Sequence, residues 1–150
     1  MQRLADDTWV ISASYLTQLS QCPWLVARKT DEKLDKGVRV PELTDPMMEL
    51  VKRLGIVHEE RVLTQLKETL TTVVEIPYDR SVSSTDSARW KTTISDAAHK
   101  TVEALGSRAD AIFQGVFFQE SLPDTSLPVA FQGFADFLVH GEQGLSLIHI

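Results

Sequence analysis

The stretch FQGFADFLVH, residues 131–140, places a single carboxylate in an otherwise apolar run. Phe134 and Phe137 lie on either side of Asp136 in the sequence, and Leu138 and Val139 follow. A carboxylate that is buried without a partner either costs several kcal/mol or takes up a proton. Asp136 is therefore expected at the surface, beside a basic group or beside a metal ion, and this stretch alone leaves all three settings open.

The stretch forms the second half of an expected antiparallel hairpin. Strands are expected at 109–118 and 129–139, separated by a turn over 119–128 that contains two prolines. A shorter strand is expected at 72–77, upstream of the hairpin. These strands predict a sheet region over about 109–139, with one further strand before it.

Helices are expected in the first two thirds of the chain. Residues 12–35 are helical in pattern, with a break at Pro23, because proline lacks the amide donor that a helix interior needs. Asp45 followed by Pro46 predicts the start of a helix that ends at about residue 70. A further helix is expected over about 88–105, where Gly106 suits the C-cap. The order predicts an α/β (α+β mixed) fold with a helical region over about 12–70.

Composition narrows the class of protein. The 150 residues fit one domain, and 43% of them are hydrophobic. The net charge of −6 argues against a broad basic surface for nucleic acid, although a local basic groove is compatible with it. The single cysteine excludes an internal disulfide, and the first ten residues contain no apolar signal-peptide core. A cytoplasmic protein without a membrane span is the simplest prediction.

The last six residues, LSLIHI (145–150), look foreign to the chain. They can be encoded by CTGTCTCTTATACACATC, which resembles the end sequence of a transposon-based sequencing adapter. We therefore expect natural sequence over 1–144 and an artefactual tail after it, so that His149 and Ile150 carry no function. The alternative is an ordinary apolar terminal strand.

Four stretches in this order resemble RecB-like nucleases of the PD-(D/E)XK superfamily, of the type often fused to a DEAD/DEAH-box helicase. They are ISASYLTQLSQCPWLVARKTDEKL (11–34), RLGIVHEERVLTQLKE (53–68), SRADAIFQGVFF (107–118) and FQGFADFLV (131–139). The resemblance implies an α/β core with a mixed sheet and a metal site at its bend. It also implies phosphodiester hydrolysis with Mg²⁺ or Mn²⁺ held by carboxylates.

By this resemblance, Asp136 is the first catalytic carboxylate and a metal ligand. The family also uses a helix histidine after a glycine, and His58 follows Gly55 here at a shorter spacing than in some relatives. His58 is thus the second expected metal ligand, and the alternative is a satisfied core histidine on the apolar face of its helix. Glu59 is expected to be solvated, with a supporting role implied by the family pattern of histidine followed by glutamate.

The family's next strand, which carries (D/E)xK, is missing. After Asp136 the chain contains Glu142 but no lysine. We interpret the chain as the N-terminal portion of the nuclease domain, truncated before the third core strand, and expect it to fold poorly and to lack nuclease activity. Degradation of single-stranded DNA that needs Mn²⁺ and is lost in Asp136→Ala would contradict this expectation.

Three further residues enter through the resemblance. Some relatives use a cysteine at the place of Cys22 as a ligand of a [4Fe–4S] cluster, with three more cysteines far downstream that this chain does not have. A small buried hydrophobe is the alternative for Cys22. Gln114 is a candidate for contact with DNA, and Asp110 for a supporting role; both alternatively satisfy neighbouring backbone groups.

Three functions remain in competition. The first is a metal-dependent nuclease module in DNA repair, recombination or defence that acts on single-stranded DNA or DNA ends, with a fused or associated helicase. The second is a catalytically dead nuclease fold that binds DNA or another protein. The third is a small acidic structural protein whose resemblance to the family arises by chance. The residue at the position of the missing lysine distinguishes the first function from the second.

Overall fold

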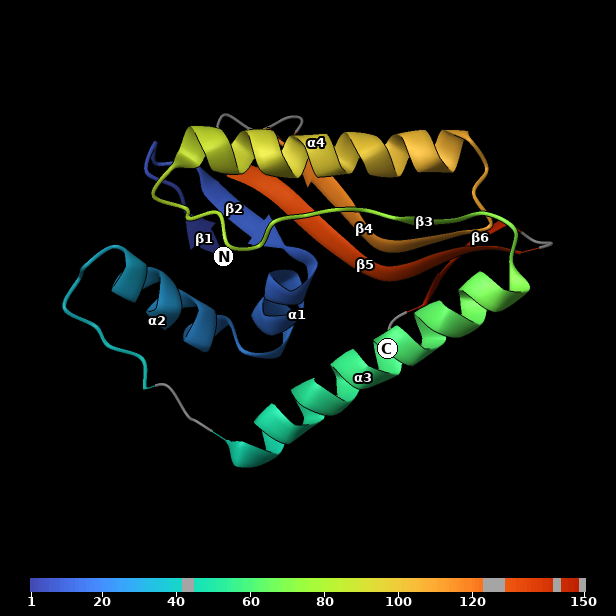
Figure 1. Ribbon diagram of the computed structural model, residues 1–150. Coiled ribbons are helices and arrows are strands. Elements are labelled where there is room, and N and C mark those ends of the chain that lie inside the picture. Colours follow the sequence, from blue (N-terminus) through green and yellow to red (C-terminus); the bar gives the residue numbers. More distant parts are fainter. Residues whose placement is uncertain (42–44, 123–128, 142–143, 149–150) are drawn as a thin grey trace. The chain divides into compact units, whose positions relative to one another are not determined.

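In the computed structural model, the structure describes residues 1–41, 45–122, 129–141 and 144–148. Glu142, His149 and Ile150, and residues 123–128 of the expected turn, lie outside this part of the chain. The elements, labelled in Figure 1, are β1 (Gln2–Arg3), β2 (Trp9–Ser12), α1 (Ala13–Gln21), α2 (Pro23–Lys33), α3 (Pro46–Thr69), β3 (Val73–Glu75), α4 (Ser87–Gly106), β4 (Ala111–Gln119), β5 (Val129–Gly141) and β6 (Gly144–Ile148).

The strands form one mixed sheet, which confirms the α/β prediction. The strand order is β1-β2-β5-β4-β3, and β6 pairs with β5 in addition. β2 and β5 are parallel, as are β3 and β4, whereas β1 is antiparallel to β2 and β6 to β5. The hairpin and all the expected helices are present. β1 and β2 were not predicted.

The helix boundaries follow from local chemistry. The Asp45 carboxylate accepts a hydrogen bond from the Met47 amide at 2.9 Å, so the expected cap and first-position proline begin α3. At the end of α4 the prediction of a Gly106 cap is wrong. Gly106 lies within the helix, and the left-handed residue is Arg108, with a φ of 56°. The Ala109 amide donates to the Ala104 carbonyl at 3.2 Å, which closes a Schellman turn around Arg108.

Contacts divide the chain into two units, and β4, β5 and α4 contribute to both. The first unit is Met1–Leu43, Arg80–Thr92 and Phe118–Gly133. It contains β1, β2, α1, α2 and the pairing of β2 with the first residues of β5. Trp90 is buried in it and meets Phe118 edge to face, with 5.8 Å between the ring centroids.

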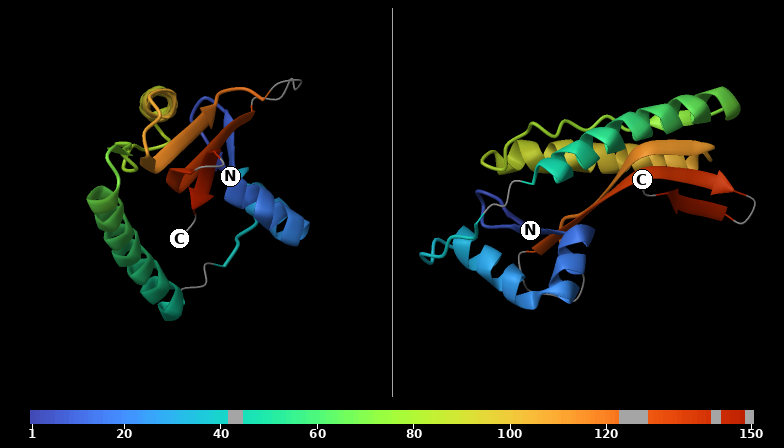
Figure 2. Two further views of the ribbon diagram at one scale, coloured as in Figure 1. Left: turned by 90° about the vertical axis from the view of Figure 1, so that its right-hand side faces the viewer. Right: turned by 90° about the horizontal axis from the view of Figure 1, so that it is seen from below.

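The second unit is Thr44–Asp79, Thr93–Phe117 and Phe134–Ile150, and it contains Asp136. Its core is built by Ile94, Ile112 and Phe137, each at most 1% exposed. Within this unit α4 covers one face of β4 and β5, and α3 lies away from that face (Figure 2). No helix in the described residues has the length and apolar character needed to cross a membrane.

β6 (Gly144–Ile148) includes residues 145–148 of the tail, and a terminal strand is the element that the alternative interpretation of the tail predicted. None of its residues is buried, and Leu145, Leu147 and Ile148 are 49%, 55% and 41% exposed. An open sheet edge can accept any short apolar segment. The foreign origin of the tail therefore stays a prediction.

Candidate functional site

The pairing of β4 with β5 places Asp136 opposite Gln114. Near the start of β4, the His140 amide donates to the Asp110 carbonyl at 2.8 Å. The rings of Phe113 and Phe137 lie 4.9 Å apart. A Cβ added to Gly115 would lie 3.7 Å from the Cβ of Ala135. These contacts share one antiparallel register, and in that register Gln114 is the partner of Asp136.

The two faces of β5 exchange at Asp136. Ala135 and Leu138 both approach Gly115, on the side where Thr101 of α4 lies. Neighbours along a strand point to opposite faces, so Asp136, which follows Ala135, belongs to the side away from α4. Phe137, which precedes Leu138, belongs to that side for the same reason. The regular alternation of faces is therefore broken between Asp136 and Phe137. We call this side the Asp136 face. Asp136 is half-buried on it and has an interaction partner, so it is neither freely solvated nor isolated in the core.

Gln114 has a backbone conformation that is unusual inside a strand. Its φ is 54°, in the left-handed region, which costs a residue other than glycine on the order of 1–3 kcal/mol. Irregular strand positions of this kind bend a sheet and occur often beside active sites. Gln114, opposite Asp136, is such a position, and the site at a bend in the sheet that the resemblance implies stays a prediction.

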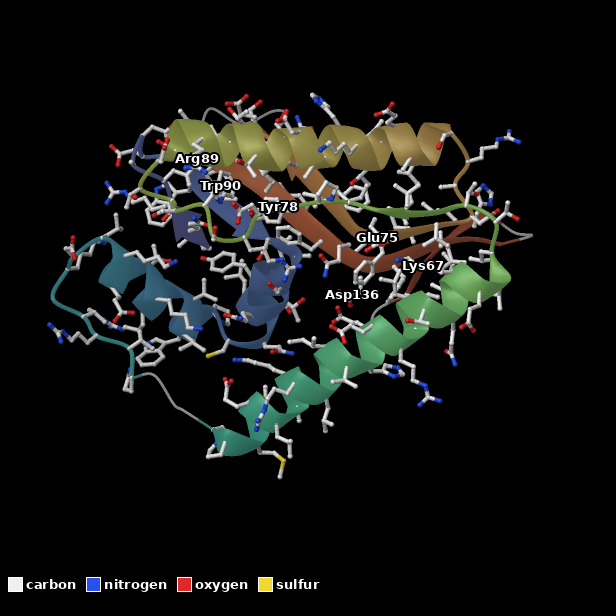
Figure 3. The ribbon with its side chains drawn as sticks, in the orientation of Figure 1. Lys67, Glu75, Tyr78, Arg89, Trp90 and Asp136 are labelled. Carbon is white, nitrogen blue, oxygen red and sulfur yellow. The ribbon has the colours of Figure 1, made fainter. Side chains whose placement is uncertain are left out.

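A lysine and a second carboxylate belong to the same face. Glu75 of β3 is in register with Phe113, so its side chain shares the side of Phe113 and Phe137. The Lys67 ammonium, from the last turns of α3, lies 2.5 Å from a Glu75 carboxylate oxygen (Figure 3). The sequence analysis missed both residues. Glu75 could have been found, because it is a charged residue inside the short apolar stretch VVEIP. Asp136 occupies the same kind of position in FADFLV.

His58 and Glu59 are placed differently from the prediction. His58 is exposed, so the core-histidine alternative is wrong. The half-buried residues of α3 are Gly55, Glu59, Val62, Leu63 and Leu66, and Glu59 has an interaction partner, so the expected solvated glutamate is also wrong. The apolar residues of α3 surround its first half, which is why their spacing does not identify the inward face.

Asp110 satisfies backbone groups, one of its two predicted roles. One carboxylate oxygen accepts hydrogen bonds from the Thr72 amide and hydroxyl, both at 2.8 Å, and from the Thr71 amide at 3.1 Å. The bonds from Thr72, and then that from Thr71, stabilise the charged form and lower the pKa of Asp110. Asp110 therefore joins the turn after α3 to the start of β4.

The position of Cys22 also differs from the prediction. Its thiol is exposed between α1 and α2, so the interpretation as a small buried hydrophobe is wrong. Cys22 is the C-cap of α1 and the N-cap of α2, and Pro23 at the first position of α2 starts the new helix directly after it. An iron–sulfur role needs three further cysteines, and it stays a prediction.

The donor atoms on the Asp136 face suit a hard cation, but the set is small. Asp136 and Glu75 offer carboxylate oxygens and Gln114 an amide oxygen, the ligand types that Mg²⁺ and Mn²⁺ take. In the part of the chain that the structure describes, no three residues among His, Cys, Asp and Glu gather as a metal-binding group, so His58 does not complete one with Asp136. Mg²⁺ commonly uses one or two carboxylates and keeps water for its other positions.

Comparison with known proteins returned no match to this chain, whether among family models, curated proteins or solved structures. The RecB-like resemblance therefore rests on the four stretches of sequence alone.

Proposed function

We propose that this chain is part of a metal-dependent nuclease that hydrolyses DNA phosphodiester bonds, with Asp136 as a metal ligand. The observation that carries the proposal is the half-buried Asp136 at the irregularity of β5, opposite the strained Gln114. A carboxylate that simply faced solvent could lie on a regular strand. It would need neither the exchange of faces in β5 nor the strained backbone of Gln114. The resemblance supplies the PD-(D/E)XK core and the substrate class, single-stranded DNA or DNA ends, with a fused or associated helicase as the partner.

Each residue on the Asp136 face has a defined part in this proposal. Asp136 holds the ion, and Glu75 fixes the Lys67 ammonium on the same side of the strands. The positive charge of the ammonium favours the approach of a phosphodiester to a chain whose net charge is −6. The bound Mg²⁺ or Mn²⁺ supplies neutralisation of charge on the phosphate and a water of lowered pKa.

The test is metal binding and not cleavage, because no lysine follows Asp136 in this chain. Free Mn²⁺ is measured by electron paramagnetic resonance during titration of the protein. We expect Asp136→Asn to weaken Mn²⁺ binding at least about tenfold, since an amide removes the ligand charge and keeps the shape. Asp35→Asn, at an exposed position after α2, is the matched control and should bind Mn²⁺ as the unaltered chain does.

Equal Mn²⁺ binding by the unaltered chain and by Asp136→Asn would overturn the proposal. Binding of single-stranded DNA that neither Mn²⁺ nor Asp136→Asn changes would support the catalytically dead DNA-binding module instead.

A further inference from the structure

We propose that the first unit of the chain binds a small phosphate-bearing molecule in a cavity beside β1. The cavity has a volume of about 460 Å³, which lies in the range of small-molecule sites. The residues that line it all belong to the first unit, whereas Asp136 belongs to the second. The site is therefore separate from the proposed nuclease site and does not depend on it.

Three segments that are far apart in the sequence line the cavity. β1 and the turn after it contribute Arg3 and Asp7, the last residue of α2 is Lys33, and the segment before α4 contributes Ser84 and Thr85. The described residues around the cavity thus carry two positive charges and one negative charge. The chain as a whole has a net charge of −6, so this local excess of positive charge favours an anionic ligand.

The Lys33 ammonium has donor capacity left for such a ligand. It donates a hydrogen bond to the Met1 carbonyl, which leaves further N–H groups, and it forms no ion pair with the described residues. Burial, and then the positive charge of Lys29, lower the pKa of Lys33, and Glu32 opposes only part of this effect. A phosphate group in the cavity would supply the negative charge that Lys33 lacks.

Arg3 is oriented by its neighbours, but its donors are not all used. Its Nε and Nη2 atoms donate to one carboxylate oxygen of Asp7, at 3.1 and 2.6 Å. The guanidinium also lies over the Trp9 ring, 5.9 Å from the ring centroid. The remaining N–H groups of the guanidinium are free to bind phosphate oxygens, which match its planar arrangement of donors. Arg3 and Lys33 therefore provide a pair of cations for one phosphate group.

The neutral residues leave room for more than the phosphate group. The Ser84 and Thr85 hydroxyls can donate to phosphate oxygens, and the Thr85 hydroxyl is already oriented by that of Ser83, at 2.8 Å. Leu4 and Ala5 add apolar surface to the wall of the cavity. A phosphate ion makes no use of apolar surface, whereas a small phosphate monoester does. The phosphate group is the shared chemistry, and its source is either such a monoester or the free ion.

Isothermal titration calorimetry of the whole chain measures the binding of ribose 5-phosphate, inorganic phosphate and ribose. We expect ribose 5-phosphate to bind and ribose not to bind. Lys33→Gln should weaken ribose 5-phosphate binding about tenfold, the effect of losing one hydrogen bond between charged groups. Lys36→Gln is the matched control, because Lys36 follows the same helix and is paired with Asp31 at 3.1 Å, outside the cavity. Its affinity should stay within about twofold of the unaltered chain.

Asp7 provides a test with the opposite sign. Its carboxylate lines the cavity and repels an anion, so Asp7→Asn should bind ribose 5-phosphate several-fold more tightly. Asp7 has a φ of 63°, a conformation that asparagine also adopts. A variant that had lost its fold would not gain affinity, so this result would separate an effect on binding from an effect on stability.

Equal binding of ribose 5-phosphate by the unaltered chain and by folded Lys33→Gln would overturn the proposal. Binding of ribose as tight as that of ribose 5-phosphate would do the same. Circular dichroism shows whether Lys33→Gln is folded, and if it is not, Asp7→Asn decides, because unchanged or weaker binding by that variant also overturns the proposal. If inorganic phosphate binds more tightly than ribose 5-phosphate, the phosphate site stands and its ligand is the free ion.

Discussion

The two longest helices, α3 and α4, use their apolar residues in opposite ways. In α4 the buried residues, Trp90, Ile94, Ala97, Thr101 and Ala104, recur at spacings of four and three and form one face. No residue of α3 is buried, although its large apolar residues are numerous. Those more than 40% exposed are Met47, Met48, Leu50, Val51, Leu54, Ile56 and Val57. The comparison teaches that a high apolar content alone leaves a helix with exposed apolar surface. A helix packs into a core when its apolar residues lie on a single face.

Truncation of one apolar side chain in each helix should give the largest difference. Ile94 is 0% exposed and Leu54 is 59% exposed. We expect Ile94→Ala to lower the free energy of unfolding by about 2–5 kcal/mol, because it leaves a cavity. Leu54→Ala should change it by about 0.5 kcal/mol or less. Urea denaturation measures both, and equal losses would show that α3 is packed as tightly as α4.

A buried hydroxyl sharpens the comparison within α4. The Thr101 hydroxyl accepts a hydrogen bond from the Val116 amide at 2.9 Å and donates to the Ala97 carbonyl at 3.0 Å. Thr101→Val leaves the Val116 amide without this acceptor and should cost about 1–3 kcal/mol in urea denaturation.

The matched control for Thr101→Val lies on the same helix. Thr92 donates to the Ala88 carbonyl in the same way, but it is exposed. Thr92→Val should be nearly neutral, and a similar loss at both positions would mean that the bond to Val116 contributes little.

The smallest effect concerns pH, at the first turn of α4. A hydrogen bond from Lys91 lowers the pKa of Asp6 to about 2. The folded pKa lies below the ordinary value of 3.8, so this contribution to stability is present above pH ~4 and is lost as the pH falls towards 2. In acid titrations followed by circular dichroism, the stability of Asp6→Asn should fall less between about pH 4 and pH 2 than the stability of the unaltered chain. An unchanged titration curve would exclude Asp6 as a contributor.

Elements with strong local signals could be predicted from the sequence. The Asp45–Pro46 start of α3 depends on neighbouring residues only, as does the break at Pro23. β2 could not be predicted, because its parallel partner in β5 lies more than a hundred residues later in the chain. Such pairing is decided by tertiary structure and not by a four-residue pattern.

Some residues of the candidate site could likewise be predicted from local sequence, and others could not. Asp136 was visible because a carboxylate in an apolar strand is costly. Lys67 was not, because its relevance comes from a partner on another element, at Glu75. The strain at Gln114 was also hidden, since FQGV contains no local reason for a left-handed glutamine. His58 was misplaced because the apolar residues of α3 do not mark one face.

The bonds of Asp110 have a mechanical consequence for α3. The carboxylate fixes the chain at Thr71 and Thr72, directly after the helix, and Lys67 adds a second attachment close by. The 24 residues of α3 span about 36 Å, and its first half is exposed. These attachments all lie at the C-terminal end of α3, and over this length a rotation of about 5° at Thr71 corresponds to a displacement of about 3 Å at Pro46. A change in tilt about this attachment would therefore displace the first turn of α3 far more than its last.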